Sequence, residues 1–391
     1  MTEFIDSEKL WKLIFGSSPL EDDVSRWQQQ GFVLTSNFVL EQTHGGPCGI
    51  LATVQAFMLI DLIFKSNNPV RNFNELMKRD HALVTQSLVR ALLAILNRAG
   101  RENHPQTQIN LIQWNEEKCK FFSSPLKDPS ELISFTLLDF LATLIVYRGI
   151  ETTKSDMDDI SNPLISRFGH CSQEILNLVL FGRATSNVFD GEENLGEGMS
   201  LRGVAQDAQI SVGLLSELES LRYVTVGSKL KNPEFPFWLI GSTNHYTLLF
   251  SFNKVRSETV DPYIAAFQAY AFDEGIATGD SVEKISADLK LASEEKISLK
   301  SMVKEDVLLL SDYQEWIRSI RGGSGHPDSP RKTNCEFVFV DGQHPVSVLA
   351  VTLSDSELPV PEGVADYGDN LRAIVRTKWP QYRNVRALKL V

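Results

Sequence analysis

Cysteines are few in this sequence, and none of them forms a closely spaced pair. Among 391 residues there are four, which lie far apart: Cys48, Cys119, Cys171 and Cys335. Zinc ribbons need paired cysteines at short spacing, and disulfide-rich domains need many cysteines in a short chain. The pattern argues against both classes and predicts a protein of a reducing, intracellular compartment.

Positive charge and long apolar runs are also scarce. The chain has 38 Lys and Arg against 50 Asp and Glu, a net charge of −12, which disfavours non-specific binding to nucleic acid. The first residues, MTEFIDSEKLWKLIF, lack the basic segment and apolar core of a secretory signal. No run of about 20 uncharged apolar residues is present to cross a membrane. We expect a soluble protein of the cytoplasm, the nucleus or both, with no nucleic-acid or membrane partner.

The most informative stretch runs over residues 40–57 and reads LEQTHGGPCGILATVQAF. Gly45 and Gly46 permit backbone angles closed to other residues, and Pro47 fixes φ just before Cys48. The apolar residues that follow are spread around most of a helix, which predicts a buried helix over 49–65. Cys48 would then lie at a helix N-terminus, where free backbone N–H groups and the helix dipole favour the nucleophilic thiolate.

The alternative for Cys48 is a structural role, because free cysteine is often buried and behaves as a small hydrophobic residue. Two glycines in a row favour the functional interpretation, since they are costly unless the backbone must approach something closely. Gln42 lies six positions upstream and can fold back with its amide N–H₂ group. Such a donor would complete an oxyanion hole, so we interpret Cys48 as a candidate nucleophile and Gln42 as its oxyanion donor.

A β-hairpin predicted over residues 237–252 supplies the candidate base. Its two apolar runs are separated by the turn-forming residues 241–244, and His245 follows at the mouth of the second strand. Alternation predicts an apolar face with Tyr246 and a partly polar face with His245 and Thr247. His245 can meet a cysteine at a helix end. A hydrogen-bonded turn histidine is the other interpretation.

For two further sequence patterns we favour a structural role over a catalytic or metal-binding one. His170 and Cys171 are adjacent, but neighbours along a chain rarely face each other, so we expect structural or capping roles there. The acidic segment 273–280 is similar to a calcium loop but lacks the alternating oxygen ligands and the final glutamate, so we expect no calcium site.

Hydrophobic periodicity predicts the other elements. Helices are expected over 5–15, 72–98, 132–148, 174–181, 204–220, 281–292 and 300–320, and strands over 31–34, 37–40, 109–114, 221–226, 335–340 and 346–353. Residues 262–330 are richer in Glu, Lys, Ser and Gly, which is typical of an insertion. The expected fold class is α+β.

The chain resembles the MINDY family of cysteine deubiquitinases, in the subgroup with a GGPC segment followed by VQAF. Four blocks in the same order carry the resemblance: LEQTHGGPCGILATVQAF, FGHCSQEILNLVLFGRATSNVFDG, VGSKLKNPEFPFWLIGSTNHYTLLF and RTKWP. It implies a papain-like core, with the cysteine-bearing helix packed on an antiparallel sheet that presents the histidine. It also implies a catalytic domain over 1–261 and 331–391, interrupted by a degenerate EF-hand-like insertion over 262–330.

By this resemblance Cys48 is the nucleophile, His245 the general base and Gln42 the oxyanion donor. The implied activity is hydrolysis of isopeptide bonds in polyubiquitin, preferentially lysine-48-linked, without a cofactor or metal. A chain-binding protein without activity, a scaffold that recruits partners through the insertion, and a protease for a ubiquitin-like modifier remain alternatives. Oligomeric state stays open, as does the residue that orients His245, for which Thr243, Asn244 and Thr247 are nearby candidates.

The assignment of Gln42 leads to a kinetic prediction. Gln42→Ala should lower kcat by about 10²–10³, because an oxyanion donor acts on the charge that develops in the transition state. Ubiquitin affinity should stay nearly unchanged, which steady-state kinetics and a binding titration together measure. Equal losses of affinity and rate would contradict the oxyanion role.

Overall fold

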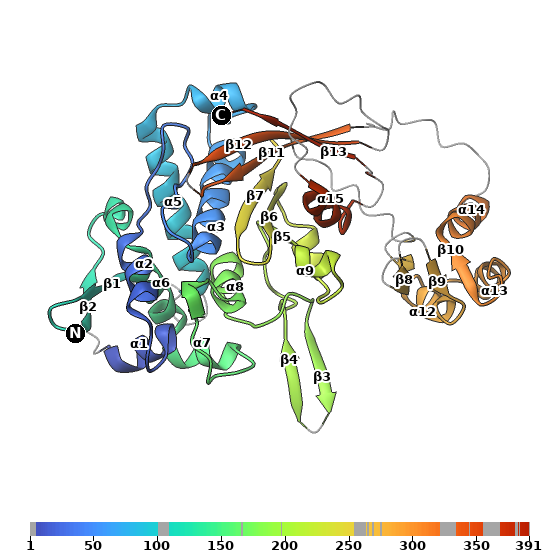
Figure 1. Cartoon of the computed structure of the whole chain (residues 1–391), viewed down its shortest axis with the longest axis horizontal. Helices are drawn as coiled ribbons and strands as arrows, with labels where there is room; N and C mark the ends of the chain where they lie inside the picture. Colours follow the sequence, from blue (N-terminus) through green and yellow to red (C-terminus); the bar gives the residue numbers. More distant parts are fainter. Residues whose placement is uncertain are drawn as a thin grey trace. The chain divides into compact units, whose positions relative to one another are not determined.

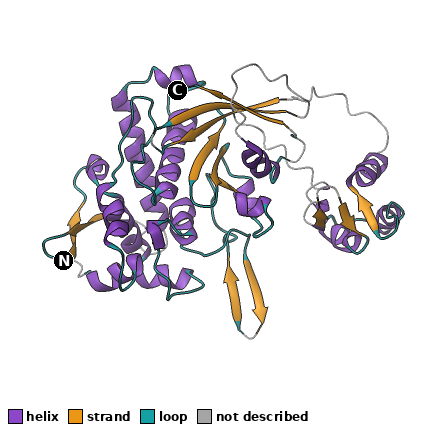
Figure 2. Ribbon diagram, viewed as in Figure 1, coloured by secondary structure: helices purple, strands orange, loops and turns teal. Residues whose placement is uncertain are grey.

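The structure, a computed structural model, divides the chain into two units. One consists of Met1–Lys254 with Asn334–Val391, and the other of Val255–Thr333. The residues described are 5–100, 109–165, 167–196, 198–253, 263, 266–267, 270–273, 276–320, 334–343, 345–354, 368–379, 382 and 384–390. Both helices and strands build the chain (Figure 2), which confirms the predicted α+β class.

The stretch after Cys48 forms the central helix of the larger unit. Helix α3 spans Cys48–Ile60, begins at the cysteine as predicted, and continues as a π-helical turn over Asp61–Lys65. Twelve of its thirteen residues are buried, because it is apolar on nearly every side. Its N-cap residue, Pro47, has no side chain that can accept a hydrogen bond from the first turn. The N–H groups at the start of α3 therefore depend on other partners.

Other helices surround α3 on one side of the main sheet (Figure 1). They are α1 (Ser7–Phe15), α2 (Glu21–Gln29), α4 (Phe73–Met77), α5 (His81–Gly100), α6 (Leu137–Arg148), α7 (Ile150–Asp156) and α8 (Gln173–Phe181). The helix predicted over 72–98 is broken at Asp80, whose carboxylate accepts the N–H of Ala82 and starts α5 anew. Likewise α6 begins at Leu137, because the Thr136 side chain caps it.

The main sheet has six strands in the order β13-β12-β11-β7-β6-β5. The predicted hairpin is confirmed as β6 (Phe237–Gly241) with β7 (Tyr246–Phe250). The strands predicted over 335–340 and 346–353 are β11 (Asn334–Asp341) and β12 (Ser347–Ser354), which pair antiparallel. Strand β13 covers Asn384–Lys389, and β5 covers Gly213–Ser216. All neighbours are antiparallel except β5 and β6, so the sheet is mixed where a fully antiparallel one was predicted.

Both faces of β7 are buried, which corrects the expectation of a partly polar face. Leu248 and Phe250 belong to the core that α3 shares. On the other face Leu249 pairs with Trp238, whose ring packs at 5.0 Å against Trp379. Trp379 follows helix α15 (Gly368–Arg376), which lies against β5 and β13. The C-terminal segment therefore covers the face that alternation alone left to solvent.

The region 204–226 differs most from the prediction. In place of a helix it contains strand β5 and the short helix α9 (Glu217–Ser220), and the strand expected over 221–226 is a loop. The apolar run 212–215 is buried at the edge of the sheet beside β6, and a strand that is covered on both faces is a continuous hydrophobic segment. Burial in the sheet therefore overrides the helical propensity of these residues. A short helix, α10 (Ser228–Lys231), follows the loop.

The larger unit also contains smaller elements. Residues 31–40 form single bridges instead of the predicted strand pair, one of them between Leu34 and Leu40. Strands β1 (Asn110–Asn115) and β2 (Lys120–Pro125) make one hairpin, and β3 (Glu192–Gly196) and β4 (Met199–Arg202) make another. The second hairpin projects away from the sheet (Figure 1).

The unit formed by Val255–Thr333 has its own core around Tyr313 and Trp316. Its described elements are β8 (Ala271–Asp273), β9 (Ile276–Thr278), α12 (Ser281–Asp288), α13 (Ser293–Lys300), β10 (Val307–Leu309) and α14 (Leu310–Ile320). Strands β9 and β10 pair antiparallel, each followed by a helix. Residues 274–275 of the calcium-like segment lie outside the described residues, and among those described no cluster of three His, Cys, Asp or Glu side chains could hold a metal ion.

Two segments have the length and apolar composition of a membrane span, counted among the described residues. They are Cys48–Lys65, of which 78% is buried within the structure, and His81–Gly100, of which 44% is buried. Both pack in the core of the larger unit. Their apolar composition is explained by that core, since a buried helix needs apolar residues on most sides.

A buried glutamine on α3 fixes the segment that leads toward Gln42. The Gln55 side chain accepts the N–H of Leu40 at 2.7 Å and donates to the Phe38 carbonyl at 3.0 Å. Gln55→Leu would leave both backbone groups without partners, at a cost of about 1–3 kcal/mol of the free energy of unfolding. Urea unfolding followed by circular dichroism measures the loss. Gln86→Leu, at an exposed position of α5, is the matched control, and equal stability of the two variants would contradict the role.

Candidate active site

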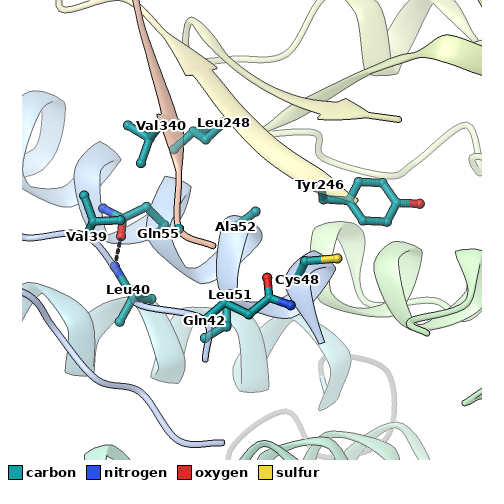
Figure 3. Close-up of a pocket in the computed structure, with 11 residues that line it drawn as sticks. Val39, Leu40, Gln42, Cys48, Leu51, Ala52, Gln55, Tyr246, Leu248 and Val340 are labelled. Atoms are coloured by element: carbon teal, nitrogen blue, oxygen red, sulfur yellow. Dashed lines mark hydrogen bonds between the residues drawn. The ribbon is translucent and has the colours of Figure 1, made fainter. Parts of the chain in front are cut away.

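Helix α3 presents Cys48 at the floor of a pocket. The pocket is lined by Val39, Leu40, Gln42, Cys48, Leu51, Ala52, Gln55, Tyr246, Leu248, Val340 and Gly342. Cys48 itself is 4% exposed. In Figure 3 its sulfur points toward the strand that carries Tyr246, and the amide of Gln42 points toward Cys48 from the opposite wall. Two of the three predicted site residues therefore share one pocket.

The turn before Cys48 uses its two glycines differently. Gly46 has a φ of +130°, and a β-carbon there would lie 2.5 Å from the Gly169 carbonyl oxygen, so only glycine fits. This close approach is the constraint that the Gly-Gly pair predicted. Around Gly45, which is exposed, no other atom lies within 4 Å of such a β-carbon, so close packing does not require glycine at this position.

Three contacts hold Gln42. Its backbone N–H donates to the Gly342 carbonyl at 2.7 Å. Its neighbours are fixed by the buried amide of Gln30, which accepts the N–H of Thr43 at 2.9 Å and donates to the Glu41 carbonyl at 3.0 Å. The Gln42 side-chain nitrogen donates to the His44 carbonyl at 2.6 Å. An amide nitrogen carries two hydrogens, so a second N–H remains available for a ligand in the pocket.

His245 lies in the turn just before β7, with its carbonyl accepting the backbone N–H and the hydroxyl of Ser242. Its ring nitrogen Nε2 lies 2.8 Å from Oδ1 of Asp341 at the end of β11. Cys48 acts on the same ring, and its hydrogen bonding and charge raise the pKa of His245. The structure thus aligns Cys48, His245 and Asp341 in one chain of contacts.

Asp341 is the partner of His245 that sequence reasoning missed. Of the nearby candidates, Thr243 donates its hydroxyl to Glu217, and Thr247 is buried in β7. Asp341 is 96 residues from His245 in sequence, and it reaches the histidine because β11 pairs with β7. The strand over 335–340 was predicted, but its place next to β7 depends on strand order, which the sequence did not reveal.

The surroundings of His245 favour its protonated form. Burial is the largest influence and by itself lowers the pKa of His245. The hydrogen bond to Asp341 opposes it, followed by the hydrogen bond and charge of Cys48, and together these raise the pKa to about 9. At neutral pH the ring is therefore an imidazolium. Burial, then the charges of Cys171 and Cys48, raise the pKa of Tyr246, so this phenol stays neutral.

This geometry is that of an activated cysteine: a sulfur at a helix N-terminus, a histidine in contact with it, and a carboxylate that orients the histidine. The sequence matches the family model described as "Deubiquitinating enzyme MINDY-3/4, conserved domain" over residues 11–136 and 130–282. The chain belongs to the MINDY-3/4 family of deubiquitinating enzymes. As a member of this family it is a cysteine-type deubiquitinating enzyme, as the sequence predicted.

Curated members of the MINDY-3/4 family align with most of the chain. "Ubiquitin carboxyl-terminal hydrolase MINDY-3" of Bos taurus is 30% identical and covers 96% of each chain, as does the human protein of that name. "Probable ubiquitin carboxyl-terminal hydrolase MINDY-4" of Xenopus tropicalis is 30% identical over 71% of this chain and 40% of its own length. No solved structure matches, so the papain-like description of the core stays a prediction.

The contact between Asp341 and His245 leads to a prediction on pH dependence. Because the pKa of His245 is raised to about 9, a reaction that needs the imidazolium should decline as the pH rises through this value. Asp341→Asn removes the hydrogen-bonding charge that raises the pKa, so the alkaline decline of kcat/KM should move to lower pH. A pH series of kcat/KM on a ubiquitin substrate measures this.

Asp159→Asn is the matched control for Asp341→Asn. It makes the same change of charge at an exposed aspartate whose carboxylate accepts hydrogen bonds from Ser161 in its own turn. Its pH profile should follow the wild type. An unshifted alkaline limb in Asp341→Asn would show that Asp341 does not control the protonation of His245.

Proposed function

We propose that this chain hydrolyses isopeptide bonds in polyubiquitin with Cys48 as nucleophile, His245 as general acid and base, and Gln42 as oxyanion donor. The observation that carries the proposal is the convergence of these side chains: Cys48 and Gln42 line one pocket, and His245 bridges Cys48 to Asp341. Membership of a deubiquitinating family supplies the substrate class.

The first half of the reaction forms an acyl-enzyme. The Cys48 sulfur attacks the carbonyl carbon of the C-terminal glycine of ubiquitin, and the free N–H of Gln42 together with the backbone N–H of Cys48 binds the resulting oxyanion. The imidazolium of His245 then protonates the leaving lysine amine as the bond to carbon breaks.

The second half releases ubiquitin. His245, now neutral, removes a proton from a water molecule that attacks the thioester carbon, and the Cys48 sulfur leaves. Asp341 acts through His245: its carboxylate holds Nε2 so that Nδ1 faces the sulfur, and it stabilises the positive ring. In this scheme Asp341 is a positioning residue, since it contacts neither substrate nor sulfur.

Preference for lysine-48-linked chains is the finer part of the proposal. It rests on the resemblance of the whole chain to the MINDY family, and the surfaces that bind each ubiquitin are left to experiment. We further propose that the protein acts in the cytoplasm, the nucleus or both, where its four free cysteines suit a reducing environment.

A protein that binds ubiquitin chains without cutting them is the second candidate, with a scaffold role for the 262–330 insertion as its variant. The set of Cys48, Gln42, His245 and Asp341 argues against both, because binding alone needs neither an oriented histidine nor a cysteine at its side. Cleavage of a ubiquitin-like modifier is an alternative within the same chemistry.

The test is a cleavage assay with tetra-ubiquitin of several linkages, followed by gel electrophoresis. Wild-type protein should shorten lysine-48-linked chains faster than the other linkages, and Cys48→Ala should leave all of them intact because the nucleophile is gone. Cys119→Ala, a cysteine on the exposed β1–β2 turn, makes the same substitution outside the pocket and should cleave like the wild type.

Each other outcome selects an alternative. Retained binding without cleavage of any linkage, in wild type and Cys48→Ala alike, would replace the enzyme by the chain-binding protein. Equal cleavage of all linkages would remove the lysine-48 preference and keep the hydrolase. Cleavage by Cys48→Ala would overturn the assignment of the nucleophile.

A further inference from the structure

A second cysteine, Cys171, lies against the turn that carries Cys48. The Gly46 carbonyl oxygen accepts the backbone N–H of Cys171 at 3.1 Å, and the same oxygen lies 3.8 Å from the Cys48 sulfur. On the other side of Cys48, a β-carbon at Gly49 would be 2.9 Å from the Cys171 sulfur. Gly46 and Gly49, which lie on either side of Cys48 in the chain, thus both approach Cys171.

The two sulfurs also share one helix terminus. The backbone N–H of Ile50, in the first turn of α3, donates to the Pro47 carbonyl oxygen at 3.1 Å, and it also acts on the Cys171 sulfur, whose pKa it lowers. The Cys171 sulfur thus lies beside the first turn of α3, where a β-carbon at Gly49 would approach it most closely. Cys48 begins the same turn. Cys171 therefore packs against the first turn of the helix that begins with Cys48.

The segment that carries Cys171 is anchored from both sides. Before it, the buried indole of Trp27 donates to the Gly169 carbonyl at 2.9 Å. After it, the Ser172 side chain caps α8 by accepting the N–H of Ile175. The backbone of Cys171 also forms an isolated antiparallel β-bridge with Ile165. Since the backbone is held, rotation of the two side chains about χ1 is the movement left to the two sulfurs.

The two cysteines differ in reactivity. Burial, then the negative charges of Cys48 and Glu174, raise the pKa of Cys171 well above its ordinary value, so Cys171 stays a thiol. The Cys48 sulfur, in contact with the imidazolium of His245, is the group suited to react first with an oxidant. A cysteine that the charged ring of His245 activates, next to a second, protonated thiol, is the arrangement of a peroxide-sensitive cysteine with its resolving cysteine.

We propose that Cys48 and Cys171 form a reversible disulfide when hydrogen peroxide oxidises the enzyme. The proposal rests on the proposed function, in which Cys48 is the reactive nucleophile, and it adds a second state of the same site. In that state the sulfur of Cys48 is unable to attack ubiquitin, and it is protected from further oxidation. Reduction by a cellular thiol restores the free cysteine.

The chemistry balances in two steps. The Cys48 thiolate attacks one oxygen of hydrogen peroxide, the O–O bond breaks, and the departing hydroxide takes the His245 proton to become water, which leaves a sulfenic acid on Cys48. The Cys171 sulfur then attacks the Cys48 sulfur, the S–O bond breaks, and the hydroxide that leaves takes the thiol proton of Cys171 as water. Two sulfurs are oxidised by two electrons in total, and one peroxide is reduced to two waters.

The first step also prepares the second. A sulfenic acid on Cys48 is neutral, so the charge that helps to keep Cys171 protonated is removed once oxidation has begun. The other two cysteines are engaged elsewhere: Cys335 lies 2.9 Å from the Tyr382 hydroxyl, and the Cys119 thiol donates to the Glu116 carbonyl.

The test treats the full-length wild type, Cys171→Ser and Cys335→Ser with hydrogen peroxide. Non-reducing peptide mass spectrometry should find the Cys48 peptide linked to the Cys171 peptide in the wild type and in Cys335→Ser, the matched control. Dithiothreitol should restore lysine-48 chain cleavage in these two proteins. In Cys171→Ser it should restore several-fold less, because Cys48 continues to sulfinic and sulfonic acid.

The proposal is overturned if oxidised wild type contains no Cys48–Cys171 peptide, and equally if Cys48 is over-oxidised to the same extent with and without Cys171. Should Cys171→Ser fail to fold, Cys171→Ala replaces it, and the linked peptide in wild type decides on its own. A linked peptide in a protein that never cleaved ubiquitin would support the disulfide and contradict the proposed function, so the two failures are distinguishable.

Discussion

The hydrogen bond between His245 and Asp341 is the contact on which the rest of the site depends. It joins the start of β7 to the end of β11, and the residue after Asp341 supplies the carbonyl that binds the backbone of Gln42. A β-carbon at Gly342 would lie 2.5 Å from the Leu40 carbonyl oxygen, so this turn can approach the Gln42 arm because it carries glycine. One turn therefore fixes both the histidine and the amide, while helix α3 fixes the sulfur between them.

Buried amides fasten the arm that carries Gln42. Gln30 and Gln55 are each about 3% exposed or less, and each makes hydrogen bonds to backbone groups on both sides of a short irregular segment. An irregular segment has no sheet or helix partners for its N–H and C=O groups, so these side chains take the place of secondary structure. Such polar contacts hold one conformation more strictly than apolar packing would, which suits an arm whose job is to place a single donor.

Much of this arrangement could be predicted from local sequence. Three elements follow from dihedral freedom, periodicity and turn residues, and all three are present: the Gly-Gly-Pro-Cys turn, the buried helix and the β6–β7 hairpin. What local sequence could not supply was pairing over long distances. Asp341 meets His245 only because β11 lies next to β7, and Cys171 meets the Cys48 turn only because the segment before α8 packs there. The parallel strand β5 was predicted as helix because its burial depends on the whole sheet.

The order of the strands in the sheet has a consequence for how the protein is made. Cys48, Gln42 and His245 all leave the ribosome before β11, which follows the entire second unit in the chain. Until that late strand inserts beside β7, the histidine lacks its carboxylate and the Gln42 backbone lacks its acceptor. A nascent or truncated chain would therefore carry the cysteine without the machinery that makes it reactive. The complete site therefore forms only after the second unit and β11 have been synthesised.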